Sequence, residues 1–238
     1  MSGVIEQLRA RKSVRAFTDE PVSAEEERSI LEAACQAPTA GNQQLYSIIV
    51  VRDAAKKAAL AKSCDHQPFI AKAPLVLAFC ADVRRWYRGF TAAGCAPREP
   101  GVGDFLLAME DTMICAQNAV VAAESLGIGS CYIGDILEKC EEQARILGCP
   151  RWVLPVSVVV FGRPTEAQMR RKKPMRWALE QVVFVDAYED VADEGLVAQL
   201  AEKQADISAF CERKWNSGFS REMTRSAARI LEQFSREA

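Results

Sequence analysis

The chain has 238 residues, of which 49% are hydrophobic and 26% are charged. These are the proportions of an ordinary globular protein, and they exclude wholesale disorder. With 30 Lys and Arg against 32 Asp and Glu, the net charge is −2, so the chain lacks the overall positive field of a nucleic-acid-binding protein. The length corresponds to one large domain or two small ones.

The cysteines indicate a reducing environment. Nine are present, an odd number, no two have C-x-x-C spacing, and His66 is the only histidine. This pattern argues against a secreted disulfide framework and against a Cys/His zinc cluster. We therefore expect buried, reduced thiols and no bound metal.

The apolar segments do not predict a membrane protein. Residues 1–10 contain no signal-peptide hydrophobic core, and the apolar stretch 105–126 is interrupted by Glu110–Asp111 and Gln117–Asn118. A bilayer-spanning helix needs about 20 predominantly apolar residues. We expect a soluble cytoplasmic protein that binds neither membrane nor nucleic acid.

Caps and hydrophobic patterns predict a mixture of helices and strands. Ser23 followed by Glu26 forms a capping-box pattern, and Asp53 can cap the next helix. Helices are predicted at 4–11, 23–37, 53–63, 104–126 and 136–147, and strands at 47–51, 74–80, 156–161 and 182–185. Residues 84–103 contain four glycines and two prolines, which favours a long loop or lid.

The helix predicted at 104–126 is the most informative element. Its polar residues fall in pairs at 110/111, 117/118 and 124/125. Most of its surface is therefore apolar, which predicts a central helix buried on several sides. Gly127 is expected to end it.

The last fifty residues differ from the rest of the chain. After Tyr188 the sequence is more polar and is predicted to be helical, with Trp215, Phe219 and Phe234 as isolated hydrophobic anchors. We expect one α/β domain at 1–187 and a helical C-terminal extension at 188–238.

Two short basic segments occur in this nearly neutral chain. If Arg11–Phe17 is extended, Arg11, Ser13 and Arg15 lie on one face, where they can bind a phosphate ester or the edge of an electron-rich ring. Residues 170–176 carry five cations in seven positions. Each segment alone is typical of a solvated surface patch. Together they suggest one shared anionic ligand, for which a phosphate fits better than a long nucleic-acid strand.

Two further segments are rich in small residues. Pro38–Gln44, P-T-A-G-N-Q-Q, offers amide groups that can contact the edge of a heterocycle, or it is a plain turn. Gly127–Gly134, G-I-G-S-C-Y-I-G, allows a flat ligand to approach the backbone N–H groups, or it is a helix stop followed by a short turn. Neither a Rossmann fingerprint nor a Walker sequence occurs.

In this order, the motifs resemble those of the nitroreductase family of flavin-dependent oxidoreductases. The resemblance covers about residues 5–185 and rests on R-x-S-x-R at Arg11–Arg15, the segments Pro38–Gln44 and Gly127–Gly134, and R-W-A-L-E-Q-V-V at Arg176–Val183. The family often has Pro-Trp after the loop glutamine, where this chain has Leu45-Tyr46. It commonly has K-x-R in the late basic motif, whereas Lys173 precedes Arg176 by three positions.

The resemblance implies an α+β fold in which helices flank a mostly antiparallel central sheet. It also implies a homodimer with two FMN sites at the interface and 1–187 as the FMN-binding domain. Because the 105–126 helix has more apolar surface than one small domain readily covers, and 188–238 adds aromatic anchors, we expect an obligate homodimer in which 188–238 packs on the partner. The implied phosphate and ribityl ligands are Arg11, Lys12 and Ser13, with Arg15 nearer the flavin ring and with Lys173 and Arg176 closing the phosphate site. Asn42 is implied at the ring edge, and the backbone of Ile133 and Gly134 beside the reactive nitrogen. Pro38, Thr39 and Ala40 are implied as further cofactor contacts.

No nucleophile–base pair is evident, so no side chain is assigned a catalytic role and a flavin would carry the chemistry. The resemblance implies that NADH or NADPH reduces the FMN, leaves, and is replaced by an electron-poor small molecule such as a nitroaromatic or quinone, a ping-pong order. Trp86, Tyr87 and Phe90 are expected on the substrate side of the lid, or they only attach the loop to the core. Two alternatives stay open: a non-catalytic flavin- or nucleotide-binding sensor, and a reductive dehalogenase or flavin-fragmenting enzyme of the same fold.

Overall fold

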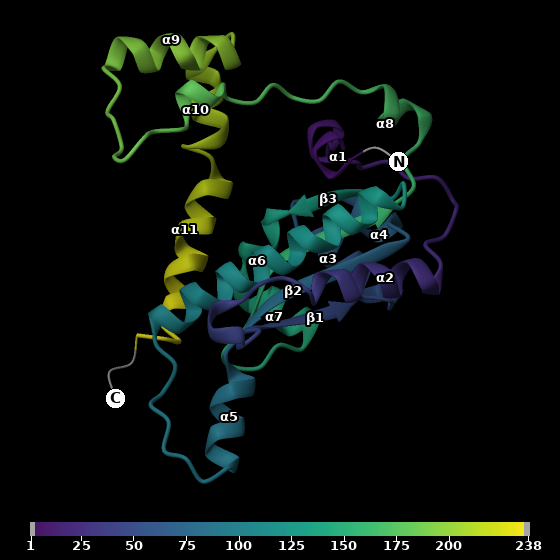
Figure 1. Cartoon of the computed structure of the whole chain (residues 1–238), viewed down its shortest axis with the longest axis vertical. Helices are drawn as coiled ribbons and strands as arrows, with labels where there is room; N and C mark the ends of the chain where they lie inside the picture. Colours follow the sequence, from purple (N-terminus) through teal and green to yellow (C-terminus); the bar gives the residue numbers. More distant parts are fainter. Residues whose placement is uncertain (1–2, 236–238) are drawn as a thin grey trace. The chain divides into compact units, whose positions relative to one another are not determined.

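The computed structural model describes residues 3–235, which form a four-stranded antiparallel sheet with helices on both faces (Figure 1). The strands are β1 (Tyr46–Val50), β2 (Leu75–Asp82), β3 (Gly129–Ile133) and β4 (Val153–Gly162), in the order β1-β2-β4-β3. Each neighbouring pair is antiparallel. The predicted α+β architecture is therefore confirmed.

The helices divide between two compact units of the chain. The first unit runs to Arg171 and resumes at Met223, and the second comprises Lys172–Glu222. The helices are α1 (Val4–Ala10), α2 (Ala24–Ala34), α3 (Ala54–Ser63), α4 (Pro68–Lys72), α5 (Arg84–Ala92), α6 (Val102–Ser125), α7 (Cys140–Leu147), α8 (Glu166–Arg170), α9 (Asp193–Lys203), α10 (Ile207–Lys214) and α11 (Gly218–Leu231). Three short 3-10 turns, η1 (Ala40–Asn42), η2 (Gly134–Leu137) and η3 (Leu179–Gln181), complete them. The predicted boundary after residue 187 falls inside the second unit.

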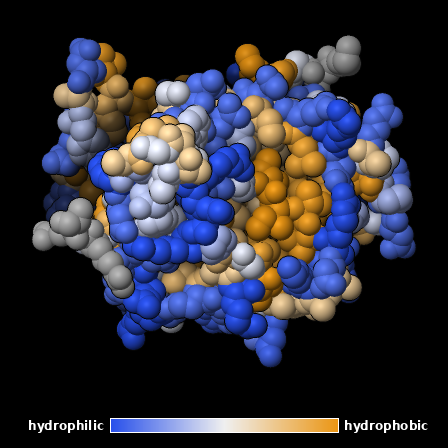
Figure 2. Space-filling model, turned by 90° about the horizontal axis from the view of Figure 1, so that it is seen from below, coloured by the Kyte–Doolittle hydropathy of each residue, from blue (hydrophilic) through white to orange (hydrophobic). Residues whose placement is uncertain are grey.

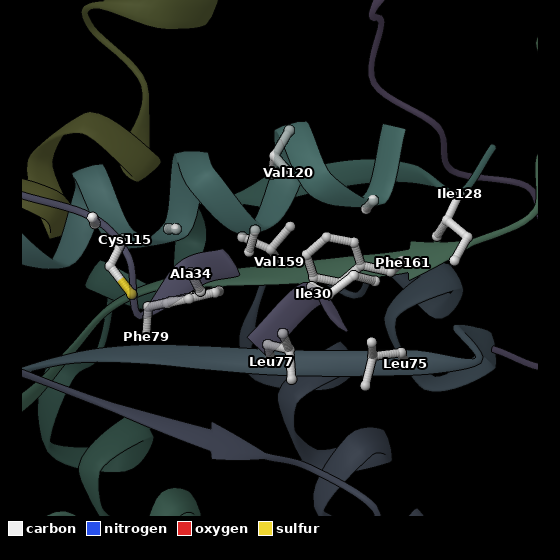
Figure 3. Packing of buried hydrophobic residues seen from close by; sticks show 14 of the residues in the cluster. Ile30, Ala34, Leu75, Leu77, Phe79, Cys115, Val120, Ile128, Val159 and Phe161 are labelled. Atoms are coloured by element: carbon white, nitrogen blue, oxygen red, sulfur yellow. The ribbon is translucent and has the colours of Figure 1, made fainter. Parts of the chain in front are cut away.

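The sheet is buried on both faces because its two central strands are almost entirely apolar. Every residue of β2 is buried, as is all of β4 after Val153. On one face, Leu77 and Phe79 of β2 and Phe161 of β4 pack against α2 and α6 (Figure 3). On the other face, α3, α4 and α7 cover a second cluster that contains Val76, Ala78 and Val158. A continuous hydrophobic run such as 156–161 predicts a sheet that is covered on both faces, and this is the arrangement observed.

Within the single chain, helix α6 is buried on one side only, whereas the sequence predicts a helix buried on several sides. Ala108, Cys115 and Ala119 face the core, whereas a second row of hydrophobic side chains is exposed. The exposed row consists of Leu106, Leu107, Met113 and Ile114. By length and composition alone α6 could cross a membrane, but its apolar inner side packs on the sheet. In the space-filling view, hydrophobic residues gather in one area bordered by hydrophilic ones (Figure 2).

Two segments differ from the prediction. Residues 84–92 form α5 rather than a loop, since Trp86 and Phe90 meet one turn apart with ring centroids 5.3 Å from each other, and only the following residues 93–101 are irregular. Residues 182–185 form no strand, and Val182, Val183 and Val185 are exposed. The glycine segment 127–134, for which a turn was one alternative, contains β3.

The predicted helix at 136–147 also divides into two pieces. The 3-10 turn η2 ends at Leu137, and α7 begins at Cys140 after Lys139, whose φ of 48° is left-handed. The helical character after Tyr188 is confirmed by α9, α10 and α11. Of the expected anchors, Phe234 is buried and stacks on Phe105 at 5.0 Å, while Trp215 is 80% exposed.

The cysteines are more evenly divided than predicted. Five are buried, namely Cys64, Cys80, Cys115, Cys131 and Cys140. Cys149 is half-buried, and Cys35, Cys95 and Cys211 are exposed.

Candidate functional site

The first basic segment is extended and attached to the edge of the sheet. Ser13 forms a parallel bridge with Ser130 of β3, and the Val14 N–H donates to the Ser130 carbonyl at 2.9 Å. Val14 is buried directly over Gly129, where an added Cβ would lie 2.5 Å from Val14 Cγ2. Gly129 is therefore required for this close packing. Because this attachment keeps the segment extended, Arg11, Ser13 and Arg15 lie on one face and Val14 on the other, as predicted.

Arg11, Ser13 and Arg15 meet around the buried thiol of Cys131 on β3. Burial raises the pKa of Cys131, and the charges of both arginines and a hydrogen bond with Ser13 oppose that rise. Arg11 Nη1 and Ser130 Oγ are buried without a hydrogen-bond partner in the protein. Because a buried donor without an acceptor is costly, these two atoms fit an oxyanion-bearing ligand such as a phosphate ester.

Lys12 is hydrogen-bonded within the protein itself and has a different role from its neighbours. Its amine donates to the carbonyls of Met169 and Arg171, the latter at 2.6 Å. The Arg15 N–H donates to Gln168 Oε1 at 2.9 Å. The Lys12 and Arg15 contacts fix the segment to α8 and to the residue that follows it.

The loop Pro38–Gln44 is held by Asp111, one of the paired polar residues of α6. The Asp111 carboxylate is 2% exposed and accepts the N–H groups of Ala40 at 2.9 Å and Leu45 at 3.1 Å. Between these two bonds the chain includes Gly41 and Asn42, both with φ of 55°. A left-handed conformation at a non-glycine residue needs support from its surroundings, and Asp111 supplies it. The signal in the sequence was the acidic residue at the centre of an apolar helix.

The aromatic residues of α5 border a pocket beside this loop. Trp86 Nε1 donates to the Gln43 carbonyl at 2.6 Å, and Trp86 and Phe90 are partly exposed. Tyr87 packs edge-on against Trp152 at 4.8 Å. The pocket has a volume of about 280 Å³ and is lined by Gln43, Leu45, Val83, Trp86, Tyr87, Phe90, Pro97, Arg98, Pro100 and Asp104. The three predicted substrate-side aromatics therefore share one cavity, although they lie on a helix.

The basic segment and the 38–44 loop lie at opposite ends of the sheet. Ser13 is next to Ser130, whose partner Phe161 pairs with Leu75 of β2. Leu45 precedes Tyr46, which pairs with Ala81 of β2. Leu75 and Ala81 are six positions apart, which corresponds to about 20 Å along the strand. Within one chain the two groups of predicted ligands are thus separate.

The other predicted ligands are placed as follows. Ile133 ends β3, and Gly134 begins η2, three and four residues after Ser130. Lys173 and Arg176 belong to the second unit, in the irregular stretch before η3. Arg176 is exposed, and its carbonyl accepts a hydrogen bond from the Lys203 amine.

The comparisons with known proteins agree on one family. The sequence model of the nitroreductase family matches residues 8–163. The chain is 31% identical over 235 residues to an FMN reductase [NAD(P)H] of Bacillus subtilis, covering 98% of this chain and 92% of the relative. It is 36% identical over 207 residues to an oxygen-insensitive NADPH nitroreductase of Salmonella typhimurium, covering 87% and 82%.

Solved structures give the same result. The fold is similar to that of the nitroreductase NfrA1 from B. subtilis, with a TM-score of 0.79, 30% identity, and coverage of 97% of this chain and 93% of the other. It is also similar to the NADPH:FMN oxidoreductase from Vibrio harveyi complexed with NAD+, with a TM-score of 0.82, 25% identity, and coverage of 96% and 97%.

Proposed function

The chain belongs to the nitroreductase family, and from this membership we propose that it is an FMN-dependent oxidoreductase that takes electrons from NADH or NADPH. The observation that carries the proposal is the group formed by Arg11, Ser13 and Arg15, in which a buried guanidinium nitrogen has no partner in the protein. The relatives named FMN reductase and NADPH nitroreductase support the same assignment.

In this proposal the chain's own residues bind and orient the cofactor. Arg11 and Ser13 hold the phosphate and ribityl oxygens by charge-assisted hydrogen bonds. Arg15 supplies a positive charge that favours an anionic reduced ring. Bound FMN supplies the redox chemistry, so no side chain needs to act as nucleophile or base.

Lys12 is better suited to positioning than to direct binding, because its amine is already bound to two carbonyls. Pro38, Thr39, Ala40 and Asn42 are proposed as ring-edge contacts held in place by Asp111. The backbone of Ile133 and Gly134 is proposed beside the reactive edge of the ring, and Lys173 and Arg176 remain predicted phosphate ligands.

The site is proposed to be completed by a second copy of the chain. The basic segment and the 38–44 loop lie about 20 Å apart along the sheet of one chain, so a cofactor at the basic segment needs the loop of a partner to close over it. The exposed hydrophobic row of α6, with Leu106 and Met113, supplies an apolar surface for that association. A folded, FMN-loaded monomer at micromolar concentration in light scattering would contradict a homodimer.

The acceptor is proposed to be a flat, electron-poor small molecule such as a nitroaromatic or quinone. The aromatic pocket beside α5 suits such a ligand. Donor and acceptor are expected to occupy the site in turn, so initial rates measured at several acceptor concentrations should give parallel double-reciprocal lines. Intersecting lines would exclude this ping-pong order.

Absorbance of the purified protein tests the function directly. A yellow protein that bleaches on anaerobic addition of NADH or NADPH, and regains colour when a quinone is added, is the expected result. A protein that binds FMN but is not bleached by either donor would instead be a flavin-binding sensor. Release of chloride or bromide from a halogenated aromatic would indicate a reductive dehalogenase. A cytoplasmic location is proposed with the function.

A further inference from the structure

The pocket beside α5 has a mostly apolar lining that contains one ion pair. Among the described residues that line it, Arg98 and Asp104 carry a charge at neutral pH. The other lining residues are uncharged: Gln43, Leu45, Val83, Trp86, Tyr87, Phe90, Pro97 and Pro100. Arg98 and Asp104 therefore decide whether the pocket presents a net charge to a ligand.

Arg98 and Asp104 are joined by two parallel hydrogen bonds. Arg98 Nη1 donates to Asp104 Oδ2 at 2.6 Å, and Arg98 Nη2 donates to Asp104 Oδ1 at 2.9 Å. Asp104 Oδ2 also accepts the Gly101 N–H at 2.7 Å, and Arg98 Nη1 also donates to the Glu99 carbonyl at 3.1 Å. A paired fork of this kind fixes the guanidinium in one orientation, so the pair is an ordered part of the pocket wall.

The two charges of this pair cancel at neutral pH. The hydrogen bond from Arg98 lowers the pKa of Asp104, burial opposes it, and the Gly101 N–H acts in the same direction as Arg98. The carboxylate is therefore ionised, as is the guanidinium. Adjacent unit charges of opposite sign exert little net force on a ligand ion beside them. Exposed charges outside the lining, such as Arg88 on α5, are screened at physiological salt, where the Debye length is about 8 Å.

We propose that Arg98 and Asp104 set the charge selectivity of this pocket, which takes uncharged flat molecules in preference to anionic ones. The inference rests on the proposed function, in which the pocket receives the electron acceptor. An anionic group that enters loses its water, and the apolar walls return no hydrogen bonds for it. The Arg98 donors that could compensate are already bonded to Asp104 and to the Glu99 carbonyl. Loss of either partner would leave one uncompensated charge at the wall.

Binding of two related quinones to the FMN-loaded protein tests this selectivity without turnover. The probes are an unsubstituted naphthoquinone and the same quinone carrying one sulfonate. Each is titrated without an electron donor in about 0.15 M salt, and quenching of tryptophan fluorescence gives the Kd, since Trp86 lines the pocket. The selectivity is the Kd of the sulfonate divided by the Kd of the unsubstituted quinone, and for the wild type this ratio should be well above one.

Variants of the two residues should change this ratio in opposite directions. Asp104→Asn leaves the Arg98 charge uncompensated, so the ratio should fall by about tenfold, between the effect of a charge pair in water and that near a protein surface. Arg98→Gln leaves the Asp104 charge uncompensated, so the ratio should rise by a similar factor. Arg98→Gln also leaves the Gly101 N–H its bond to Asp104, which preserves the start of α6 if Asp104→Asn does not fold.

Arg88→Gln is the matched control, because it removes the same charge from an exposed position of α5 outside the lining. Its ratio should equal that of the wild type. The proposal is overturned if the wild type binds the sulfonate as tightly as the unsubstituted quinone or binds neither, or if Arg98→Gln changes the ratio no more than Arg88→Gln. Steady-state rates with NADPH keep the proposed function separate, since a protein that shows the selectivity in binding but reduces neither quinone lacks only the proposed activity.

Discussion

A guanidinium nitrogen buried without an acceptor is an expensive feature, and Arg11 Nη1 is such an atom. Its cost is removed when an anionic ligand arrives, which makes Arg11 the residue whose replacement should affect cofactor binding most directly. Arg11→Ala is expected to weaken FMN binding by about 1.5–3 kcal/mol, the range for a hydrogen bond to a charged group. Quenching of FMN fluorescence during titration of the apoprotein measures this affinity.

The control for Arg11 is Arg28→Ala, which removes the same charge from an exposed position where the side chain pairs with Glu32. FMN affinity should be unchanged in that variant. Equal affinities for wild type and Arg11→Ala would show that the unpaired nitrogen does not serve the phosphate.

Asp111 is expected to act on the cofactor through the loop that it holds. Asp111→Ala leaves the N–H groups of Ala40 and Leu45 without their acceptor, at a cost of about 1–3 kcal/mol for each buried donor. Thermal denaturation should show the loss of stability. FMN affinity and the visible spectrum of the bound flavin should change as well, because the loop proposed to contact the ring edge is released.

Thr112→Val is the matched control for Asp111. Thr112 is equally buried and adjacent, but its hydroxyl donates to Ala108 within α6 at 2.6 Å. This variant should alter stability with little effect on FMN. If Asp111→Ala and Thr112→Val both lower the melting temperature and neither affects the flavin, Asp111 is only a structural residue.

Helix α5 carries the predicted substrate-side residues. The combined Trp86→Ala and Tyr87→Ala variant is expected to change kcat and KM for bulky acceptors, because two walls of the pocket are removed, while FMN occupancy stays at the wild-type level. Tyr87 also packs on Trp152, so the single variant Trp86→Ala is the cleaner test. A lower melting temperature with unchanged acceptor kinetics would assign these rings to the core alone.

The attachment of α11 to α7 should depend on acidic pH. A hydrogen bond from Arg225 lowers the pKa of Glu141 to about 2, from its ordinary 4.5. A carboxylate whose pKa is depressed by folding stabilises the protein above its unfolded pKa, and this contribution is lost as the pH falls from about 4.5 towards 2. Both side chains are about half exposed, so the effect at neutral pH should be no more than about 1 kcal/mol.

Circular dichroism melting curves of Glu141→Gln against wild type, recorded from pH 7 to pH 3, test this dependence. The difference in melting temperature should shrink as the pH falls. Glu142→Gln, which removes a neighbouring charge with only a 3.9 Å contact to Arg145, should show a smaller difference throughout. A Glu141→Gln difference that grows towards low pH would contradict the depressed pKa.

Much of the element pattern could be predicted from sequence because short-range chemistry determines it. The Ser23–Glu26 capping box and the Asp53 cap form as predicted, and the apolar runs at 74–80 and 156–161 become β2 and β4. The composition of 84–103 predicted a loop, but its first part forms α5, because most of the glycines and prolines are concentrated after that helix. The hydrogen bond from the Ala40 N–H to the Asp111 carboxylate joins residues 71 positions apart. A local sequence pattern cannot predict such a long-range contact.

The order of the motifs predicts a set of site residues, but it does not predict how one chain distributes them. The basic segment meets Ser130 at one end of the sheet, and the 38–44 loop is at the other. The spacing of the motifs along the sequence does not reveal this separation, because both segments lie outside the strands that separate them.

In the proposed homodimer this separation has a genetic consequence: two variants that each impair the FMN site should complement each other. Arg11→Ala and Asp111→Ala damage opposite ends of the same chain, so a dimer containing one of each has one site with both defects and one with neither. Random exchange of subunits should therefore restore about a quarter of the wild-type sites, since half of the dimers are mixed and each has one intact site. Unfolding and refolding the two purified variants together, followed by an NADPH-dependent quinone assay, measures the recovery. Each variant refolded alone is the control, and a mixture no more active than these controls would place each complete site within a single chain.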